Sequence, residues 1–309
     1  MSAVKRNVVL IAGPTASGKS AVALSLAEDH RGVVINADSM QVYRELSILT
    51  ARPTAEEASR APHRLYGHVP ASEPYSAGRF AIEAEAVVAE AHADGLLPIF
   101  AGGTGLYLKS LIEPMSPIPT IDETVRQRQR AAMEAEGPEE RHCLLQSVDP
   151  ESAARISPSD TQRIVRALEV AEATGRTLTE WHGAAKAPPI LDADEIVKIV
   201  LWPEREWLRQ RIAARFHLMV ANGALEEASR YRALGLSDEL PATRAHGLRA
   251  MMKVAAGEMD METAIQGVID ETRQYAKRQF TWYRHQFAGW PQIDPAAGNV
   301  AAIIAGMLG

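Results

Sequence analysis

The residues with the clearest chemistry form the stretch GPTASGKS, in which Gly13, Gly18, Lys19 and Ser20 fit the G-x-x-x-x-G-K-[ST] pattern. Glycines let backbone N–H groups turn toward phosphate oxygens, and a helix that begins at such a loop adds partial positive charge. Lys19 offers a point charge and Ser20 a hydroxyl for Mg²⁺. The pattern predicts a phosphate site built from Gly13, Pro14, Thr15, Ala16, Ser17, Gly18, Lys19 and Ser20.

Three further groups could act on a bound phosphate ester. Asp38 follows an apolar run in NADSMQVY, Thr104 lies in the glycine-rich stretch AGGTGLYLKSL, and Arg211 and Arg215 share one face of a predicted helix. Each has a plainer interpretation: Asp38 as a helix cap, Gly102–Gly105 as a turn, and Arg215 as a solvated charge. Taken together they suit either phosphoryl transfer from ATP or displacement of a whole diphosphate, and composition and spacing do not decide between these.

Elements that could position these groups alternate along the chain. Strand-like runs occupy residues 8–12, 33–36, 65–69, 97–101 and 196–201, with helical stretches between them. This predicts an α/β fold with a P-loop-type, mostly parallel sheet flanked by helices, and places function at the carboxyl ends of the strands. Residues 121–189 are predicted to form an inserted helical domain, and residues 1–120 with 190–309 a catalytic core whose C-terminal region is helical.

Composition narrows the class of protein. The chain has 309 residues, 46% of them hydrophobic, and a single cysteine, Cys143, which we interpret as a structural thiol on a helix. No apolar run approaches the length of a membrane span, so we expect a cytoplasmic protein without membrane contact. The net charge of −6 argues mildly against a nucleic-acid partner, but TRQYAKRQFTWYRH at 272–285 interleaves four basic residues with aromatic ones. That segment fits either a basic RNA-binding surface or an amphipathic core helix.

Several motifs occur in a fixed order: GPTASGKS, NADSMQVYRELSILTARPT, PYSAGRF, FAGGTGLYLKSL, DTQRIVRALEVAEATG, RFHLM and TRQYAKRQFTWYR. In this order, from about residue 8 to about residue 290, the chain resembles the bacterial tRNA dimethylallyltransferases, also called tRNA isopentenyltransferases. The resemblance implies transfer of a dimethylallyl group from dimethylallyl diphosphate to N6 of the adenosine immediately 3′ of the anticodon. The diphosphate held by the P-loop would then be the leaving group. The resemblance also implies a monomer that uses Mg²⁺ and binds the anticodon stem-loop of tRNA.

The resemblance assigns roles to individual residues. Asp38 would accept the proton of N6, while Lys19, Thr104, Arg215 and Mg²⁺ at Ser20 would stabilise the leaving diphosphate. The target adenine must leave its stack to reach Asp38. The residues implied to contact tRNA are Asp38, Ser39, Met40, Gln41, Thr104, Arg126, Gln162, Arg163, Ile164, Val165, Arg166, Arg244, Arg249, Lys277, Arg278, Gln279, Phe280, Thr281, Trp282, Tyr283 and Arg284. We expect the basic ones to line one face beside the catalytic channel.

Two positions depart from the family pattern. Leu248 stands where the family usually has an aromatic residue, so we expect stacking on RNA to be lost there, and Arg52 replaces a common lysine. Other activities remain possible from the sequence. These are an adenylate isopentenyltransferase that uses free AMP, ADP or ATP, a small-molecule P-loop kinase, and a non-catalytic tRNA-binding protein with a relict P-loop.

Overall fold

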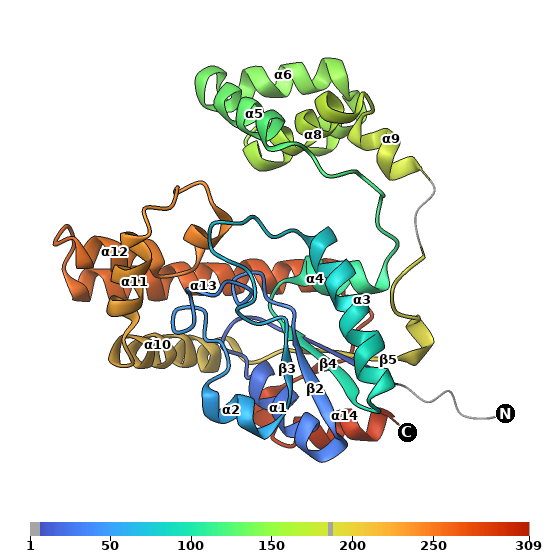
Figure 1. Ribbon diagram of the computed structural model, residues 1–309, viewed down its shortest axis with the longest axis vertical. Helices are drawn as coiled ribbons and strands as arrows, with labels where there is room; N and C mark the ends of the chain where they lie inside the picture. The colour runs from blue at the N-terminus through green and yellow to red at the C-terminus, as the bar shows by residue number, and fades with distance from the viewer. Residues whose placement is uncertain (1–6, 185–187, 309) are drawn as a thin grey trace. The chain divides into compact units, whose positions relative to one another are not determined.

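The computed structural model describes residues 7–184 and 188–308 (Figure 1). The chain divides into two compact units. The core unit comprises Met1–Ile112 with Ile190–Gly309, and the helical unit comprises Glu113–Pro189. From the sequence we placed the start of the helical segment at residue 121, whereas the compact unit begins at Glu113.

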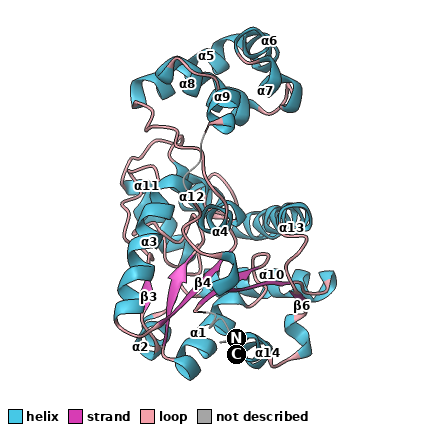
Figure 2. Ribbon diagram, turned by 90° about the vertical axis from the view of Figure 1, so that its right-hand side faces the viewer, coloured by secondary structure: helices cyan, strands magenta, loops and turns pink. Residues whose placement is uncertain are grey.

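The core unit is built on a six-stranded sheet in the order β3-β2-β4-β1-β5-β6, and all the strand pairs are parallel. Its four inner strands, β1, β2, β4 and β5, are largely buried apolar runs, as expected of a parallel sheet that helices cover on both faces (Figure 2). The strand bounds are β1 Val8–Ala12, β2 Gly32–Asn36, β3 His63–Arg64, β4 Leu97–Gly102, β5 Ile196–Leu201 and β6 Gln292–Ile293. The predicted α/β class with a mostly parallel sheet is confirmed.

Side chains alternate between the two faces of the sheet, because successive residues of a strand point in opposite directions. Val9 and Ile11 of β1 pack with helices α1 (Lys19–His30) and α14 (Val300–Leu308). Val8 and Leu10 belong to a larger cluster with the helices of the opposite face. Those helices are α3 Ala77–Ala93, α4 Gly105–Ile112, α10 Arg205–Ala221 and α13 Met261–Gln286.

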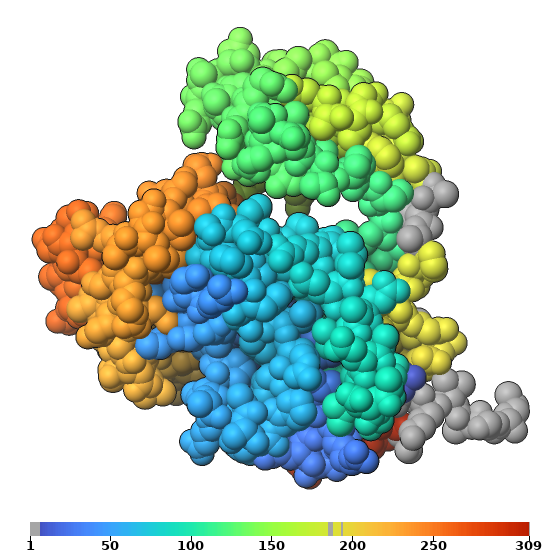
Figure 3. Space-filling view, viewed as in Figure 1, coloured from blue at the N-terminus to red at the C-terminus, as the bar shows by residue number. Residues whose placement is uncertain are grey.

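The C-terminal part of the core unit is helical, as predicted. Helices α11 (Ala224–Ala233) and α12 (Leu248–Ala255) pack together and against α10 and α13, in the orange region of Figure 3. The first residue of α12, Leu248, is completely buried in the core. This position therefore contributes to packing, and in this chain it offers no exposed ring or side chain to RNA.

One predicted strand is wrong. Residues 65–69 are a loop that makes only an isolated bridge from Val69 to Tyr43, and the neighbouring strand β3 ends at Arg64. Leu65 and Gly67 both have positive φ, at 62° and 56°, which no extended strand allows. The alternating pattern of LYGHV is typical of a strand, but the backbone has positive φ at Leu65 and Gly67. The edge strand β6 has only two residues and was not predicted.

The helical unit has its own small core. Its helices are α5 Glu123–Glu136, α6 Pro138–Val148, α7 Pro150–Arg155, α8 Thr161–Thr174 and α9 Leu178–Gly183. Leu145, Ile164 and Leu168 are buried together between them. Buried Asp149 caps α7 by accepting from the Ser152 N–H at 3.1 Å, and it also accepts from the Thr179 hydroxyl of α9 at 2.6 Å. Cys143 lies on α6 as predicted, and it is exposed.

No helix in the part of the chain that the structure describes is long and apolar enough to cross a membrane.

Candidate active site

The candidate site lies where three neighbouring strands of the core unit end. The P-loop follows β1, residues 37–41 follow β2, and residues 103–105 follow β4, which lies between the other two strands. The Ala37 N–H donates to Ala101 O at 3.0 Å, and the Thr104 N–H donates to Ala37 O at 3.2 Å. A Cβ at Gly102 would lie 2.0 Å from the carbonyl of Ala37, so this close approach of two backbones requires glycine.

Lys19 holds the P-loop closed on itself. Its ammonium donates to Gly13 O at 2.9 Å and to Pro14 O at 2.8 Å, and helix α1 begins directly after left-handed Gly18. Burial lowers the pKa of Lys19 from its ordinary 10.5 to about 7, although the negative charge of Asp38 opposes this and the positive charge of Arg215 adds to it. Ser20 is exposed on the first turn of α1.

Two arginines of α10 reach the same loop. The Arg211 Nε donates to Ala16 O at 3.0 Å, and the Arg215 guanidinium donates to the Thr15 hydroxyl. The predicted i, i+4 face of this helix is therefore directed at the P-loop. Burial lowers the pKa of Arg215 from 12.5 to about 10, so this guanidinium is still charged at neutral pH.

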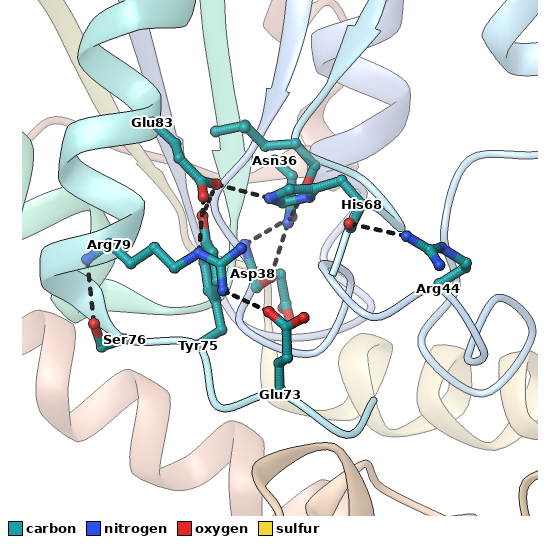
Figure 4. Close-up of polar contacts among 10 residues, drawn as sticks. Asn36, Asp38, Arg44, His68, Glu73, Tyr75, Ser76, Arg79 and Glu83 are labelled. Atoms are coloured by element: carbon teal, nitrogen blue, oxygen red, sulfur yellow. Dashed lines mark hydrogen bonds and ion pairs between the residues drawn. The ribbon is translucent and has the colours of Figure 1, made fainter. Parts of the chain in front are cut away.

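Asp38 is fixed by Asn36, a fully buried residue at the end of β2 (Figure 4). The Asp38 N–H donates to Asn36 Oδ1 at 2.8 Å, and Asn36 Nδ2 donates to Asp38 O at 2.9 Å and Leu65 O at 3.0 Å. One oxygen of the Asp38 carboxylate accepts from the Met40 N–H at 3.0 Å. The next helix, α2, runs over Ala55–Arg60, so Asp38 closes a tight turn and caps no helix.

The hydroxyl of Thr104 joins two of the loops. It accepts from the Ser39 N–H at 2.9 Å and donates to Ser39 Oγ at 3.1 Å. The side-chain amide of Gln41 is also used within the protein, because it donates to Thr50 O and Ala51 O at 2.8 and 3.0 Å. Thr104 and Gln41 therefore hold the Asp38 loop in place.

The motif PYSAGRF forms a polar cluster around Glu83 of α3. Glu83 of α3 accepts from the Tyr75 hydroxyl at 2.6 Å and from Arg79 Nε at 2.9 Å, and His68 Nε2 lies 2.7 Å from the same carboxylate (Figure 4). The contacts of His68 and Tyr75 tie the segment before α3 to that helix, and the Arg79–Glu83 contact lies within it, which explains the motif as a structural one.

A chamber of about 200 Å³ lies between these loops and the helices. Its polar lining includes Thr15, Asp38, Ser39 and Arg215, together with Thr50, His246 and Thr272. Its apolar lining includes Leu49, Ile212, Phe216, Met219 and Val268. Arg244 is exposed on the 3-10 helix Pro241–Arg244 and lines the same chamber. Arg249 is also exposed, and it donates to Asp238 O at 3.0 Å.

The residues of α13 that were predicted to bind tRNA face three directions. Arg278 and Trp282 line a shallow cleft beside Gly103–Leu106, together with Tyr275, which also lines the chamber. Four others line a groove between α13 and α10 that also contains Arg205 and Arg209; these four are Lys277, Phe280, Thr281 and Arg284. The expectation that the basic residues share one face is therefore wrong within this helix.

Two of the predicted tRNA contacts on α13 are buried. Gln279 and Tyr283 are only 6% and 1% exposed, and both bond to the P-loop and to Gly103. Their side chains face the loops, which corrects the assignment made from the resemblance. The i, i+4 spacing of two polar residues on an otherwise apolar helix face was the available signal.

In the helical unit, the predicted contacts lie on α5 and α8, which pack against each other. Ile164 is fully buried in the core of this unit, so it is not a surface contact. The neighbouring Gln162 and Arg163 are exposed, and Val165 is half-buried. The arginines pair with acids of their own helices: Arg126 with Glu123, Arg163 with Asp160 and Arg166 with Glu169, at 3.4–3.7 Å.

Comparison with known proteins gives a consistent set of relatives. The IPP transferase family model matches residues 41–286, and that of the isopentenyl transferases matches residues 6–69. The tRNA dimethylallyltransferases of Nitrobacter hamburgensis and Chelativorans sp. are 51% and 52% identical to this chain. These matches cover 97% and 91% of this chain, and 95% and 96% of the two relatives.

Solved structures extend the similarity to the fold. The tRNA isopentenylpyrophosphate transferase of Bacillus halodurans is 34% identical with a TM-score of 0.68, covering 98% of this chain and 95% of that one. A eukaryotic dimethylallyltransferase acting on tRNA is 28% identical with a TM-score of 0.76, covering 93% of this chain and 73% of the other. The similarity thus includes both the core unit and the helical unit.

Proposed function

The chain belongs to the IPP transferase family and is an enzyme that prenylates tRNA, and from this premise we propose its donor, acceptor atom and catalytic residues. The donor is dimethylallyl diphosphate, and the acceptor is N6 of the adenosine 3′-adjacent to the anticodon. The enzyme works as a monomer in the cytoplasm. A free adenine nucleotide as acceptor is not favoured, because the relatives that match nearly the full chain are tRNA enzymes.

One observation carries this proposal: the P-loop residue Thr15, the arginine Arg215 and the carboxylate of Asp38 line one chamber together with the apolar side chains of Ile212, Phe216 and Met219. An apolar wall suits a five-carbon chain and excludes water from the reacting carbon. A small-molecule kinase has no need of such a wall beside its phosphate loop. The arrangement therefore favours displacement of the diphosphate over phosphoryl transfer.

The chain's own groups divide the chemistry between them. Negative charge builds on the diphosphate as the bond to C1 breaks, and Lys19, Arg215 and the P-loop amides are placed to stabilise it. The adenine N6 is a poor nucleophile, and Asp38 accepts its proton as the new C–N bond forms. Thr104 keeps the Asp38 loop in position through Ser39.

A magnesium ion that binds to the diphosphate of the donor fits this site. Ser20 offers an exposed hydroxyl at the start of α1, and no group of three or more His, Cys, Asp or Glu side chains suited to a metal occurs in residues 7–184 and 188–308. Mg²⁺ commonly keeps several waters and binds through substrate phosphates, so one protein ligand suffices. The ion would neutralise charge on the leaving group.

Two arginines are the first candidates for contacts to the RNA near the reacting base. Arg244 lies at the chamber, and Arg278 lies at the cleft beside it, with Tyr275 common to both. The adenine leaves the anticodon-loop stack to reach Asp38, as base-modifying enzymes require. The exposed cations of the helical unit are proposed to hold the same RNA.

Incubation with radiolabelled dimethylallyl diphosphate and a defined acceptor tests the proposal. We expect label in a tRNA with adenosine 3′ of the anticodon, and none in the same tRNA carrying guanosine there or in AMP. Label in AMP would identify an adenylate isopentenyltransferase. Hydrolysis of ATP without prenyl transfer would contradict the proposed donor.

A further inference from the structure

Helix α13 buries two polar side chains against the catalytic loops. Gln279 and Tyr283 are one turn apart, so they lie on the same face of the helix, whose other buried members include Ala276 and Val268. A buried amide or hydroxyl costs free energy unless it forms hydrogen bonds. Their partners therefore indicate what these two residues hold.

Each of the two side chains lies within hydrogen-bond distance of two different loops. The Thr15 N–H of the P-loop donates to Gln279 Oε1 at 2.8 Å, and Gln279 Nε2 donates to Gly103 O at 2.8 Å. The Tyr283 hydroxyl lies 2.9 Å from Gly103 O and 3.1 Å from Gly13 O, so it can donate to either carbonyl. Burial raises the pKa of Tyr283 well above its ordinary value, which keeps this hydroxyl protonated as a donor.

One held loop is the P-loop, and the other, at Gly103, adjoins the loop of the proposed base, because the Thr104 hydroxyl accepts from the Ser39 N–H at 2.9 Å. A Cβ at Gly103 would lie 2.6 Å from Gln279 Nε2 and 3.2 Å from Asp38 Oδ2, so the amide and the proposed base both lie close to this glycine. Thr15 accepts from the Arg215 guanidinium through its own hydroxyl. The pair thus contacts the diphosphate side and the acceptor side of the site at once.

We propose that Gln279 and Tyr283 are positioning residues that fix the P-loop relative to the Gly103 loop, and so fix the donor carbon relative to the N6 held by Asp38. The inference rests on the proposed function, since it needs a donor on one loop and an acceptor on the other. Neither side chain takes part in bond making. A shift of about 1 Å between reacting groups costs about 100-fold in rate, so small loop movements suffice for a large effect.

Single-turnover kinetics separates this role from a purely structural one. Tyr283→Phe removes one hydroxyl and keeps the ring, which stacks on Phe287, and Gln279→Met keeps the volume and removes the amide. With donor and tRNA saturating, we expect the rate of prenyl transfer to fall about 10- to 100-fold in each variant. The dissociation constants of donor and tRNA should change less than about threefold, because the binding groups remain.

Tyr231→Phe is the matched control. Tyr231 is as deeply buried as Tyr283, and its hydroxyl lies 3.0 Å from the Thr243 hydroxyl of a 3-10 helix. We expect it to lower the melting temperature by a similar amount and to leave the single-turnover rate unchanged. Should Tyr283→Phe and Gln279→Met also lose only thermal stability, the positioning role would be wrong.

The design also distinguishes failure of this inference from failure of the proposed function. If the wild-type enzyme prenylates AMP in place of tRNA, the acceptor assignment fails, and the same variants are compared with AMP as acceptor. The positioning role is supported when the ratio of variant to wild-type rates falls with whichever acceptor the wild type uses. A ratio near one in single turnover overturns it.

Discussion

The low pKa of Lys19 makes donor binding depend on pH in a direction that the structure specifies. The free enzyme holds this ammonium away from water against two carbonyl oxygens, with a pKa of about 7. A diphosphate favours the charged form, so binding takes up a proton whenever Lys19 is neutral beforehand. The affinity for the donor is therefore highest below pH 7 and falls as the pH rises above 7.

The magnitude follows from that pKa. At pH 8 about nine-tenths of the free enzyme carries a neutral lysine, and binding should take up about 0.9 proton per donor. Between pH 6.5 and pH 9 the affinity should fall by a factor approaching about 100, provided the bound lysine stays charged. A lysine with the ordinary pKa of 10.5 would give almost no change over this range. Arg215, with a pKa of about 10, is charged at pH 8 and takes up almost nothing.

Isothermal titration calorimetry measures both quantities. A non-reactive thiolo analogue of dimethylallyl diphosphate is titrated with Mg²⁺ at several pH values, in buffers of different ionisation enthalpy. The control Lys19→Arg carries a charge that does not titrate here, so it reports the ionisation of the ligand alone. Proton uptake near zero at pH 8 in the wild type, or the same pH dependence in both proteins, would refute the reasoning.

Five further substitutions test other parts of the protein. Asp38→Ala should lower turnover about 10²- to 10⁴-fold at unchanged donor affinity, and near-normal turnover would remove its role as the base. Asn36→Ala leaves buried backbone groups without partners and should cost about 2 to 4 kcal/mol of unfolding free energy in urea, with a loss of turnover; wild-type stability would contradict this. Glu227→Ala removes a buried carboxylate that accepts four hydrogen bonds from residues 47–49, and should cost about 3 kcal/mol or more in the same assay. Arg278→Ala should lower the slope of the salt dependence of tRNA binding by about one, and Lys277→Ala, which lies at the groove with α10, should lower it by less. The reverse order would place the RNA along that groove.

The parts of the fold that could be predicted are those whose signal is local. Buried parallel strands are continuous apolar runs, so β1 was predicted with its observed bounds, and β2, β4 and β5 were located within a residue. The P-loop likewise depends on eight consecutive residues. Residues 65–69 show the limit of this signal. Their alternating pattern is typical of a strand, but two positive φ angles make the backbone a loop.

What could not be predicted depends on partners far away in the chain. Gln279 and the Thr15 amide that it accepts from are 264 positions apart, and Glu227 holds residues 178 to 180 positions before it. The apolar residues around Gln279 and Tyr283 indicate a buried helix face, but the sequence does not identify the partner of a residue on that face. The resemblance assigned Gln279 and Tyr283 to RNA because it implied tRNA contacts for the whole segment that contains them. Only the fold shows which way each side chain of that segment faces.

The order of the strands has a consequence for how this enzyme could change. Asp38 follows β2 and the P-loop follows β1, and β4 alone separates them. Adjacent strands lie about 4.8 Å apart, so main-chain hydrogen bonds set the strand ends that carry the base and the P-loop about 10 Å apart. Side-chain replacement in the chamber could therefore admit a wider or narrower prenyl group with ease. A donor that needs a longer reach between base and diphosphate would require a different sheet.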